Sequence, residues 1–100
     1  MLLYNYIHLI KEWAKERGLL DYGIPYSQAL KTLEETKELV KAIEKGNIQE
    51  IKDGIGDIFV TLVILCEQLH FKLEDCVGFA YEQIKDRKGK IVNGQFVKED

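Results

Sequence analysis

Five acidic side chains on two neighbouring stretches of the sequence have the types and spacing of a metal site. Glu34, Glu35 and Glu38 lie within KTLEETKELVKAI, and Asp53 and Asp57 enclose the glycine-rich segment DGIGD. Carboxylate oxygens are the ligands that Mg²⁺ and Mn²⁺ prefer in proteins. Metal chemistry at this place therefore requires that the folded chain bring the two stretches together.

The first stretch belongs to a helix predicted over residues 26–45, which begins near Pro25 and ends at Gly46. At 100° per residue, the three glutamates lie opposite an apolar stripe. Glu34 and Glu38 form a like-charge pair one turn apart, which mildly destabilises a helix. A solvated acidic face and a ligand-binding face both remain open. The stripe consists of Ala29, Leu33, Thr36, Val40 and Ile43.

The second stretch belongs to a helix predicted over residues 47–70, with Asn47 as N-cap and Glu50 completing a capping box. Asp53 and Asp57 share a stripe with apolar residues. From Ile58 to Cys66 the helix is apolar on every side, so we expect it to be covered all round. Asp57 should then be at least partly buried, where a carboxylate must be paired, bound to a metal or protonated.

An antiparallel pairing of these two helices places Glu35 and Glu38 across a groove from Asp53 and Asp57. Four converging carboxylates require neutralising cations, and an all-oxygen set of this kind suits Mg²⁺ or Mn²⁺. Within DGIGD, each glycine costs about 1 kcal/mol relative to alanine in a helix. Close helix packing and close approach of a ligand both explain the glycines.

The remaining elements are expected to complete a four-helix bundle. Helical spacing of apolar residues predicts a helix over 2–17, and a further helix is predicted over 73–87. Asn93-Gly94 between apolar pairs predicts a β-hairpin over 90–98. Because a lone hairpin is marginally stable, it must pack on helices or on a partner chain. The chain is thus predicted to be all-α with a short C-terminal hairpin, in a single domain spanning 1–100.

Composition narrows the class of protein. The chain has 100 residues, 46% of them hydrophobic, and a formal net charge of −3, which argues against non-specific nucleic-acid binding. The longest apolar run is too short to cross a membrane, and we recognise no signal peptide, so we expect a cytoplasmic protein. Cys66 and Cys76 are expected to be reduced and buried, and with His8 and His70 they fit no zinc spacing.

The combination of EETKE with DGIGD on the next, strongly apolar helix resembles the MazG-like nucleotide pyrophosphohydrolases. The ending AYEQIKDRKGKIVNGQFVKED is similar to short members from phages and Gram-positive bacteria. The resemblance implies Mg²⁺-dependent cleavage of a nucleoside triphosphate to the monophosphate and pyrophosphate. Glu35 and Glu38 would be metal ligands from the EExxE motif, and Asp57 from ExxD. Glu34 would be a further ligand or a base.

The chain departs from the family pattern at two positions. Gly54 stands where the family usually has the glutamate of ExxD, and Asp53 is one residue away with the same facing as Asp57. We therefore expect Asp53 to take the place of that glutamate as a metal ligand. Glu82 stands where the family often has an asparagine. These departures leave the number of metal ions open.

Candidate substrate-binding residues lie outside the acidic groups. Lys85, Arg87 and Lys88, near the end of the last helix, are expected to hold the polyphosphate, although cations also favour a helix C-terminus without any ligand. Trp13 either stacks on a nucleobase or belongs to the core. The resemblance also implies a homodimer or homotetramer, which would cover the apolar helix. The alternative is a non-catalytic protein on the same scaffold that binds a partner, a metal or a nucleotide.

Overall fold

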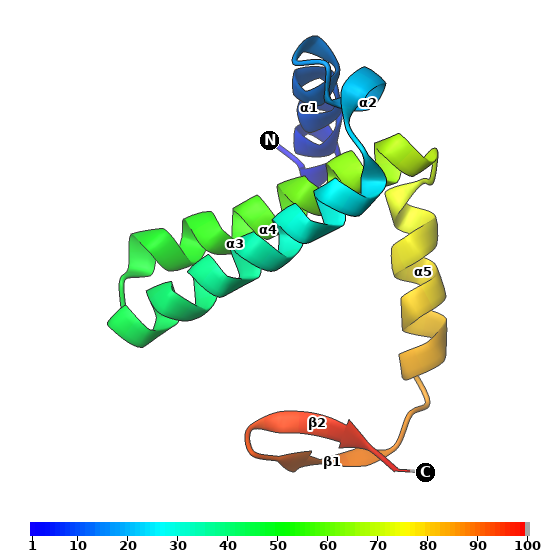
Figure 1. Cartoon of the computed structure of the whole chain (residues 1–100). Helices are drawn as coiled ribbons and strands as arrows, with labels where there is room; N and C mark the ends of the chain where they lie inside the picture. Colours follow the sequence, from blue (N-terminus) through cyan, green and yellow to red (C-terminus); the bar gives the residue numbers. More distant parts are fainter. Residues whose placement is uncertain (100) are drawn as a thin grey trace.

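The computed structural model describes residues 1–99, which form helices followed by a single β-hairpin (Figure 1). The all-α class with a C-terminal hairpin is therefore confirmed. The elements in chain order are α1 (Leu3–Glu16), α2 (Leu19–Tyr22), α3 (Pro25–Lys45), α4 (Ile48–Leu69), α5 (Leu73–Ile84), β1 (Gly89–Val92) and β2 (Gln95–Lys98).

The turn between α3 and α4 follows from its capping residues. Gly46 ends α3 in the left-handed conformation with φ 68°, which suits glycine. Asn47 caps α4, because its Oδ1 accepts a hydrogen bond from the Glu50 backbone N–H at 3.1 Å. The Glu50 carboxylate pairs with Lys45 at 3.4 Å instead of returning to the cap, so only half of the expected capping box forms.

Helix α4 is the centre of the molecule. Helix α3 runs antiparallel along one side of it, and α1 and α2 contact its second half (Figure 1). Val63 is 0% exposed and Ile64 is 3% exposed, and Ala14 of α1 is also buried. The side of α4 that bears Leu62 is left partly open, with 37% of that residue exposed. One chain therefore leaves part of this helix uncovered, and covering by a partner chain stays a prediction.

Helix α2 is an addition to the four helices that the sequence predicted. Gly18 ends α1 with φ 75°, and the chain then makes a single helical turn. Gln68 of α4 donates from Nε2 to the Leu19 carbonyl at 3.1 Å and holds this turn in place. Only glycine fits at position 23, because a Cβ there would collide with the Leu19 carbonyl and the Gln68 amide.

Helix α5 turns away from the end of α4 by 108° and ends at Ile84, three residues before the predicted boundary. The hairpin that follows pairs Ile91 with Phe96 across an Asn93-Gly94 turn in which both φ angles are positive, as in a type I′ turn. Both elements stand apart from the α1–α4 body (Figure 1). Neither Cys66 nor Cys76 forms a disulfide, and Cys76 is exposed rather than buried.

No single helix among residues 1–99 combines the length and the apolar composition needed to cross a membrane. Helices α4 and α5 meet that criterion only when they are taken together across their bend.

Candidate functional site

The four predicted metal ligands line one groove between α3 and α4. Glu35 and Glu38 contribute from α3, and Asp53 and Asp57 contribute from α4, around a space of about 280 Å³. The antiparallel pairing through Gly46 and Asn47 brings these side chains together. We call this space the acidic groove; its other lining residues are Lys41, Ala42, Lys45, Glu50 and Gly54.

The carboxylates share the groove without forming a finished coordination shell. Within residues 1–99, no three His, Cys, Asp or Glu side chains are grouped closely enough to hold a metal ion. The donors nevertheless fit a hard cation, since all four are carboxylates on two facing helices. Mg²⁺ keeps several water ligands and shares substrate phosphates, so it needs few protein oxygens at one time. The residues present therefore fit Mg²⁺ by chemistry.

Asp57 is exposed, and the expectation that it is partly buried is wrong. Helix α1 covers the second half of α4 and leaves the turn bearing Asp57 at an open rim. Asp57 lines the acidic groove and also two neighbouring cavities on the α1 side. Like Glu35, it therefore joins the groove to the larger of these cavities, and it also borders the second cavity.

Lys31 connects two of the glutamates of EETKE. Its Nζ lies 3.4 Å from Glu34 Oε1 and 3.6 Å from Glu35 Oε1. The charge of Glu34 is the main cause of a raised pKa at Lys31, and Glu35 adds to it. Glu35 is the more enclosed of the two, with 18% of its side chain exposed against 64% for Glu34. Glu34 does not line the groove, although the sequence placed it among the catalytic residues.

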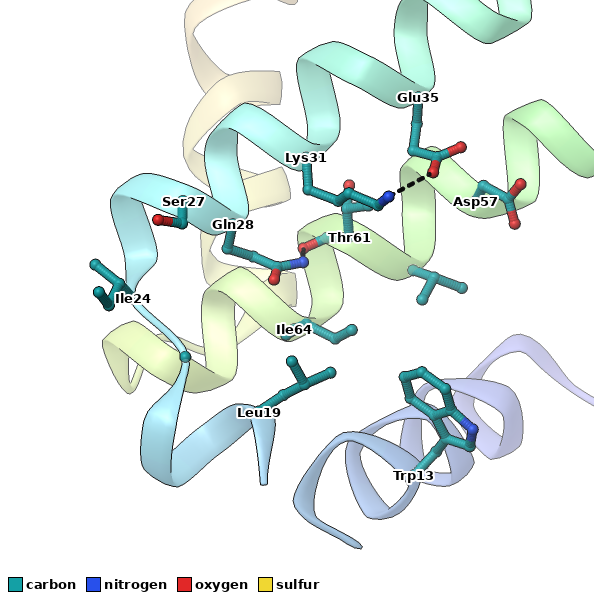
Figure 2. A pocket seen from close by; sticks show the side chains of 12 residues that line it. Trp13, Leu19, Ile24, Ser27, Gln28, Lys31, Glu35, Asp57, Thr61 and Ile64 are labelled. Carbon is teal, nitrogen blue, oxygen red and sulfur yellow. Dashed lines mark hydrogen bonds and ion pairs between the residues drawn. The ribbon is translucent and has the colours of Figure 1, made fainter. Parts of the chain in front are cut away.

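A cavity of about 470 Å³ adjoins the acidic groove and shares Glu35 and Asp57 with it. Apolar side chains from α1, α2, α4 and Ile24 line most of it, and polar groups line the edge formed by α3 (Figure 2). A volume of this size accommodates a small organic ligand. We call it the apolar cavity; its other lining residues are Trp13, Leu19, Gly23, Ile24, Ser27, Gln28, Lys31, Val60, Thr61 and Ile64.

Trp13 belongs to this cavity rather than to a closed core. It is 45% exposed, and Figure 2 shows its ring facing the space next to Leu19 and Ile64. The Arg17 guanidinium lies 4.5 Å from the ring centroid, so a cation–π contact orients the indole. Of the two readings that the sequence left open for Trp13, the position at a cavity wall favours ligand stacking.

The two glycines of DGIGD differ in their surroundings. Gly54 is buried against α3, and a Cβ at this position would lie 3.1 Å from Leu39 Cδ1 and 3.4 Å from Leu39 Cα. Gly56 has open space where a Cβ would be. Gly54 therefore allows α3 and α4 to approach closely beside the acidic groove. A glutamate at this position, as the family usually has, would require Leu39 to move.

The predicted phosphate-binding cations lie outside the groove and the apolar cavity. Lys85, Arg87 and Lys88 follow the end of α5, where Lys85 pairs with Glu82 at 2.7 Å and Arg87 faces a space near the hairpin. One chain thus does not bring these cations to the carboxylates. Their role in substrate binding stays a prediction, and it requires that a second chain or a movement of α5 bring them to the carboxylates.

Sequence reasoning missed the polar edge of the apolar cavity. Gln28 and Lys31 precede Glu35 by seven and four residues on α3, so they share its face. The spacing that linked Glu35 to Glu38 would have reached them if it had been extended by two turns towards the N-terminus. Thr61 stands one turn after Asp57 on α4 and could have been found in the same way.

Comparison with known proteins finds a matching family model and a related phage protein, but no matching solved structure. A family model described as MazG nucleotide pyrophosphohydrolase domain matches residues 25–92. An uncharacterized 18.2 kDa protein from the rep-hol intergenic region of Haemophilus phage HP1 (strain HP1c1) is 41% identical over 68 residues. That alignment covers 68% of this chain and 42% of the phage protein. No solved structure gives a significant match.

Proposed function

The chain belongs to the MazG nucleotide pyrophosphohydrolase domain family, and from this premise we propose that it hydrolyses nucleoside triphosphates to the monophosphate and pyrophosphate. Ribo- and deoxyribonucleotides are both candidate substrates. The observation that carries the proposal is the position of Asp57, at the junction of the acidic groove and the apolar cavity. A nucleoside in the cavity would then have its phosphates beside four carboxylates.

In this proposal Glu35, Glu38, Asp53 and Asp57 hold Mg²⁺, or Mn²⁺ in its place. The bound metal supplies charge neutralisation for the phosphates and a water of lowered pKa. Asp53 takes the position of the family glutamate, because it lines the groove while Gly54 is packed against Leu39. A proton leaving the attacking water passes to a carboxylate oxygen of the groove.

Lys31 and Glu34 have supporting roles in the proposal. Lys31 neutralises Glu35 while no metal is bound, through the 3.6 Å contact of its Nζ with Glu35 Oε1. If Glu35 were to hold a metal ion, Glu34 would keep the lysine at the cavity edge through its own 3.4 Å contact. Lys31 can then donate to a phosphate oxygen, and Glu34 acts by positioning it rather than by touching substrate.

Trp13 stacks on the nucleobase in the proposal. Its ring lines the apolar cavity, and Arg17 orients the ring. Base stacking on an aromatic ring is worth about 1–3 kcal/mol and accepts any base. Trp13 therefore contributes affinity, and the choice of base must come from other groups.

We also propose that the chain works as a homo-oligomer. Its accessible surface is 8159 Å², about 2,300 Å² more than the roughly 5,800 Å² that size scaling gives for a compact monomer. Its radius of gyration is 15.8 Å, against about 13 Å for a compact chain of this length. An excess of that size matches the area that obligate homodimers bury. Exposed apolar side chains on α5, such as Phe79 at 71%, supply the contact surface.

The activity is tested by incubating the purified protein with Mg²⁺ and each common NTP and dNTP, and resolving the products by ion exchange. The expected products are a monophosphate and pyrophosphate. Glu38→Gln and Asp57→Asn should each lose at least about a hundredfold in rate, the range for removal of one electrostatic group from a site. Glu44→Gln, an exposed carboxylate on the same helix α3, is the matched control and should keep full activity.

Two results would overturn the proposal. One is the absence of turnover with every nucleotide in protein shown by circular dichroism to be folded, which would favour the non-catalytic alternative. The other is equal activity in Asp57→Asn and the wild type. Calorimetric titration of Mg²⁺ into both proteins separates loss of the metal site from loss of a later step.

A further inference from the structure

Gln28 is a polar side chain of the apolar cavity whose orientation a hydrogen bond fixes. Its Nε2 donates across the α3–α4 interface to the Thr61 carbonyl at 3.2 Å (Figure 2). A carbonyl oxygen only accepts, so the amide nitrogen must face α4. The amide oxygen Oε1 is then turned to the cavity side of the bond, as Figure 2 shows. The cavity therefore presents a hydrogen-bond acceptor that cannot reverse its polarity without losing this bond.

The partner of Gln28 is itself held firmly. The Thr61 hydroxyl donates to the Ile58 carbonyl at 2.6 Å, so it accepts from the Thr32 hydroxyl, which lies 2.8 Å away. Thr61 is 5% exposed, and its contact with Thr32 joins α3 to α4. A ligand in the cavity thus meets an acceptor on a rigid support, which is what discrimination between ligands requires.

We propose that Gln28 is a specificity-determining residue for the nucleobase, which rests on the proposed function. Its Oε1 accepts a hydrogen bond from an N–H group on the Watson–Crick edge of a base stacked on Trp13. The apolar walls, among them Leu19 and Ile64, offer no acceptor, so an N–H that lies against them exchanges its water for the Gln28 amide oxygen. A site built to bond an N–H rejects an analogue that lacks it.

The test uses matched nucleotides that differ in one donor. Adenosine and purine riboside triphosphates differ in the 6-amino group, cytidine and 2-pyrimidinone riboside triphosphates in the 4-amino group, and uridine and 3-methyluridine triphosphates in the ring N–H. For the base that the wild type prefers, kcat/KM should fall about tenfold or more in the analogue, as expected for one hydrogen bond of about 1.4 kcal/mol.

The Gln28→Met variant keeps the length of the side chain and removes the acceptor. It should turn over the natural nucleotide and its analogue at similar kcat/KM, while its hydrolysis of inorganic tripolyphosphate, which has no base, stays at the wild-type rate. Gln49→Met, an exposed glutamine at the start of α4, is the control and should keep the wild-type preference. Quenching of Trp13, the single tryptophan, reports base binding independently of turnover.

The outcomes separate this inference from the proposed function. If the wild type hydrolyses nucleotides and Gln28→Met keeps the same preference for the natural base, the role of Gln28 is wrong and the proposed function stands. If Gln28→Met loses tripolyphosphate hydrolysis as well, the residue is structural and the inference is again wrong. If the wild type turns over no nucleotide, the proposed function and the inference fail together.

Discussion

Two regions of the molecule differ in how well they are packed within one chain. The first is the α3–α4 pair, and the second is the arm formed by α5 and the hairpin. The α3–α4 pair is held by a part-buried Thr32–Thr61 contact, a capped turn and the close approach at Gly54, and it carries every groove carboxylate. The arm stands apart from this body, exposes Phe79 at 71%, and carries the predicted phosphate-binding cations. The groove carboxylates thus come from one paired unit of the chain, whereas the cations on the arm lie away from them.

From this difference we infer that one copy of the chain supplies the carboxylates of a site and another copy supplies the cations. Carboxylates repel one another and need a rigid frame, which two paired helices in one chain provide. Cations that bind phosphate can arrive from another chain as an oligomer forms, provided that the arm packs against it. The following experiments test whether the arm completes the acidic groove of a second copy.

The largest expected effect comes from breaking the assembly. Phe79→Asp places a charge on the exposed apolar face of α5 and should convert the proposed homo-oligomer to a monomer, measured by light scattering during gel filtration. If the arm completes the site, nucleotide hydrolysis should fall to background at the same time. Gln83→Asp adds the same charge at an exposed polar position of α5 and should leave both properties unchanged. Full activity in a Phe79→Asp monomer would show that each chain is complete.

The next effect concerns the cations. Arg87→Ala combined with Lys88→Ala should lower kcat/KM about a hundredfold, because two charge-assisted contacts to phosphate are lost. Mixing this variant with Asp57→Asn, after unfolding and refolding them together, should restore activity if carboxylates and cations come from different chains. Mixtures that stay as inactive as the separate variants would instead place both groups on one chain.

A smaller effect separates the two glycines beside the groove. Gly56→Ala should stabilise the protein by about 0.5–1 kcal/mol, because alanine favours a helix and its Cβ has open space. Gly54→Ala should gain less or destabilise, since its Cβ would press on Leu39. Urea unfolding of both variants measures the difference. A larger gain for Gly54→Ala would mean that α3 and α4 do not approach closely at this position.

The smallest effect comes from the half-buried thiol at the junction of the two regions. Burial raises the pKa of Cys66 above its ordinary value of 9.0, and a hydrogen bond with Cys76 adds to the shift. The folded state then holds the thiol proton more tightly than the unfolded state, so the contribution of Cys66 to stability declines as pH rises above 9.0. Cys66→Ala should reduce this decline, measured by urea unfolding between pH 8 and 10.

A second measurement uses the same pair of thiols. Cys76 is exposed and should react with iodoacetamide faster than Cys66 in the folded protein, as followed by mass spectrometry of the labelled peptides. Equal rates would indicate that the α4–α5 junction opens readily. That result would also weaken the picture of a fixed arm that presents cations to a partner.

The helical spacing of apolar residues was sufficient to predict the two helices that carry the groove carboxylates. The helices predicted over 26–45 and 47–70 became α3 and α4 with one-residue differences, because proline, glycine and asparagine mark their ends. The same spacing placed Glu35, Glu38, Asp53 and Asp57 on facing sides, and they line one groove. Helix α2 was missed because a single turn between two glycines gives no periodic signal, and the contact that holds it comes from Gln68, far away in the sequence.

The sequence by itself determined the helical class, the hairpin at Asn93-Gly94 and the pairing of two acidic stretches, since each depends on local propensities or on neighbours along the chain. Only the tertiary structure decided that Asp57 lies exposed at an open rim, that Glu34 is outside the groove, and that Gln28 faces a cavity with a fixed acceptor. These outcomes depend on where α1 and α2 cross α4. That crossing follows from contacts between residues distant in sequence, and no local pattern encodes it.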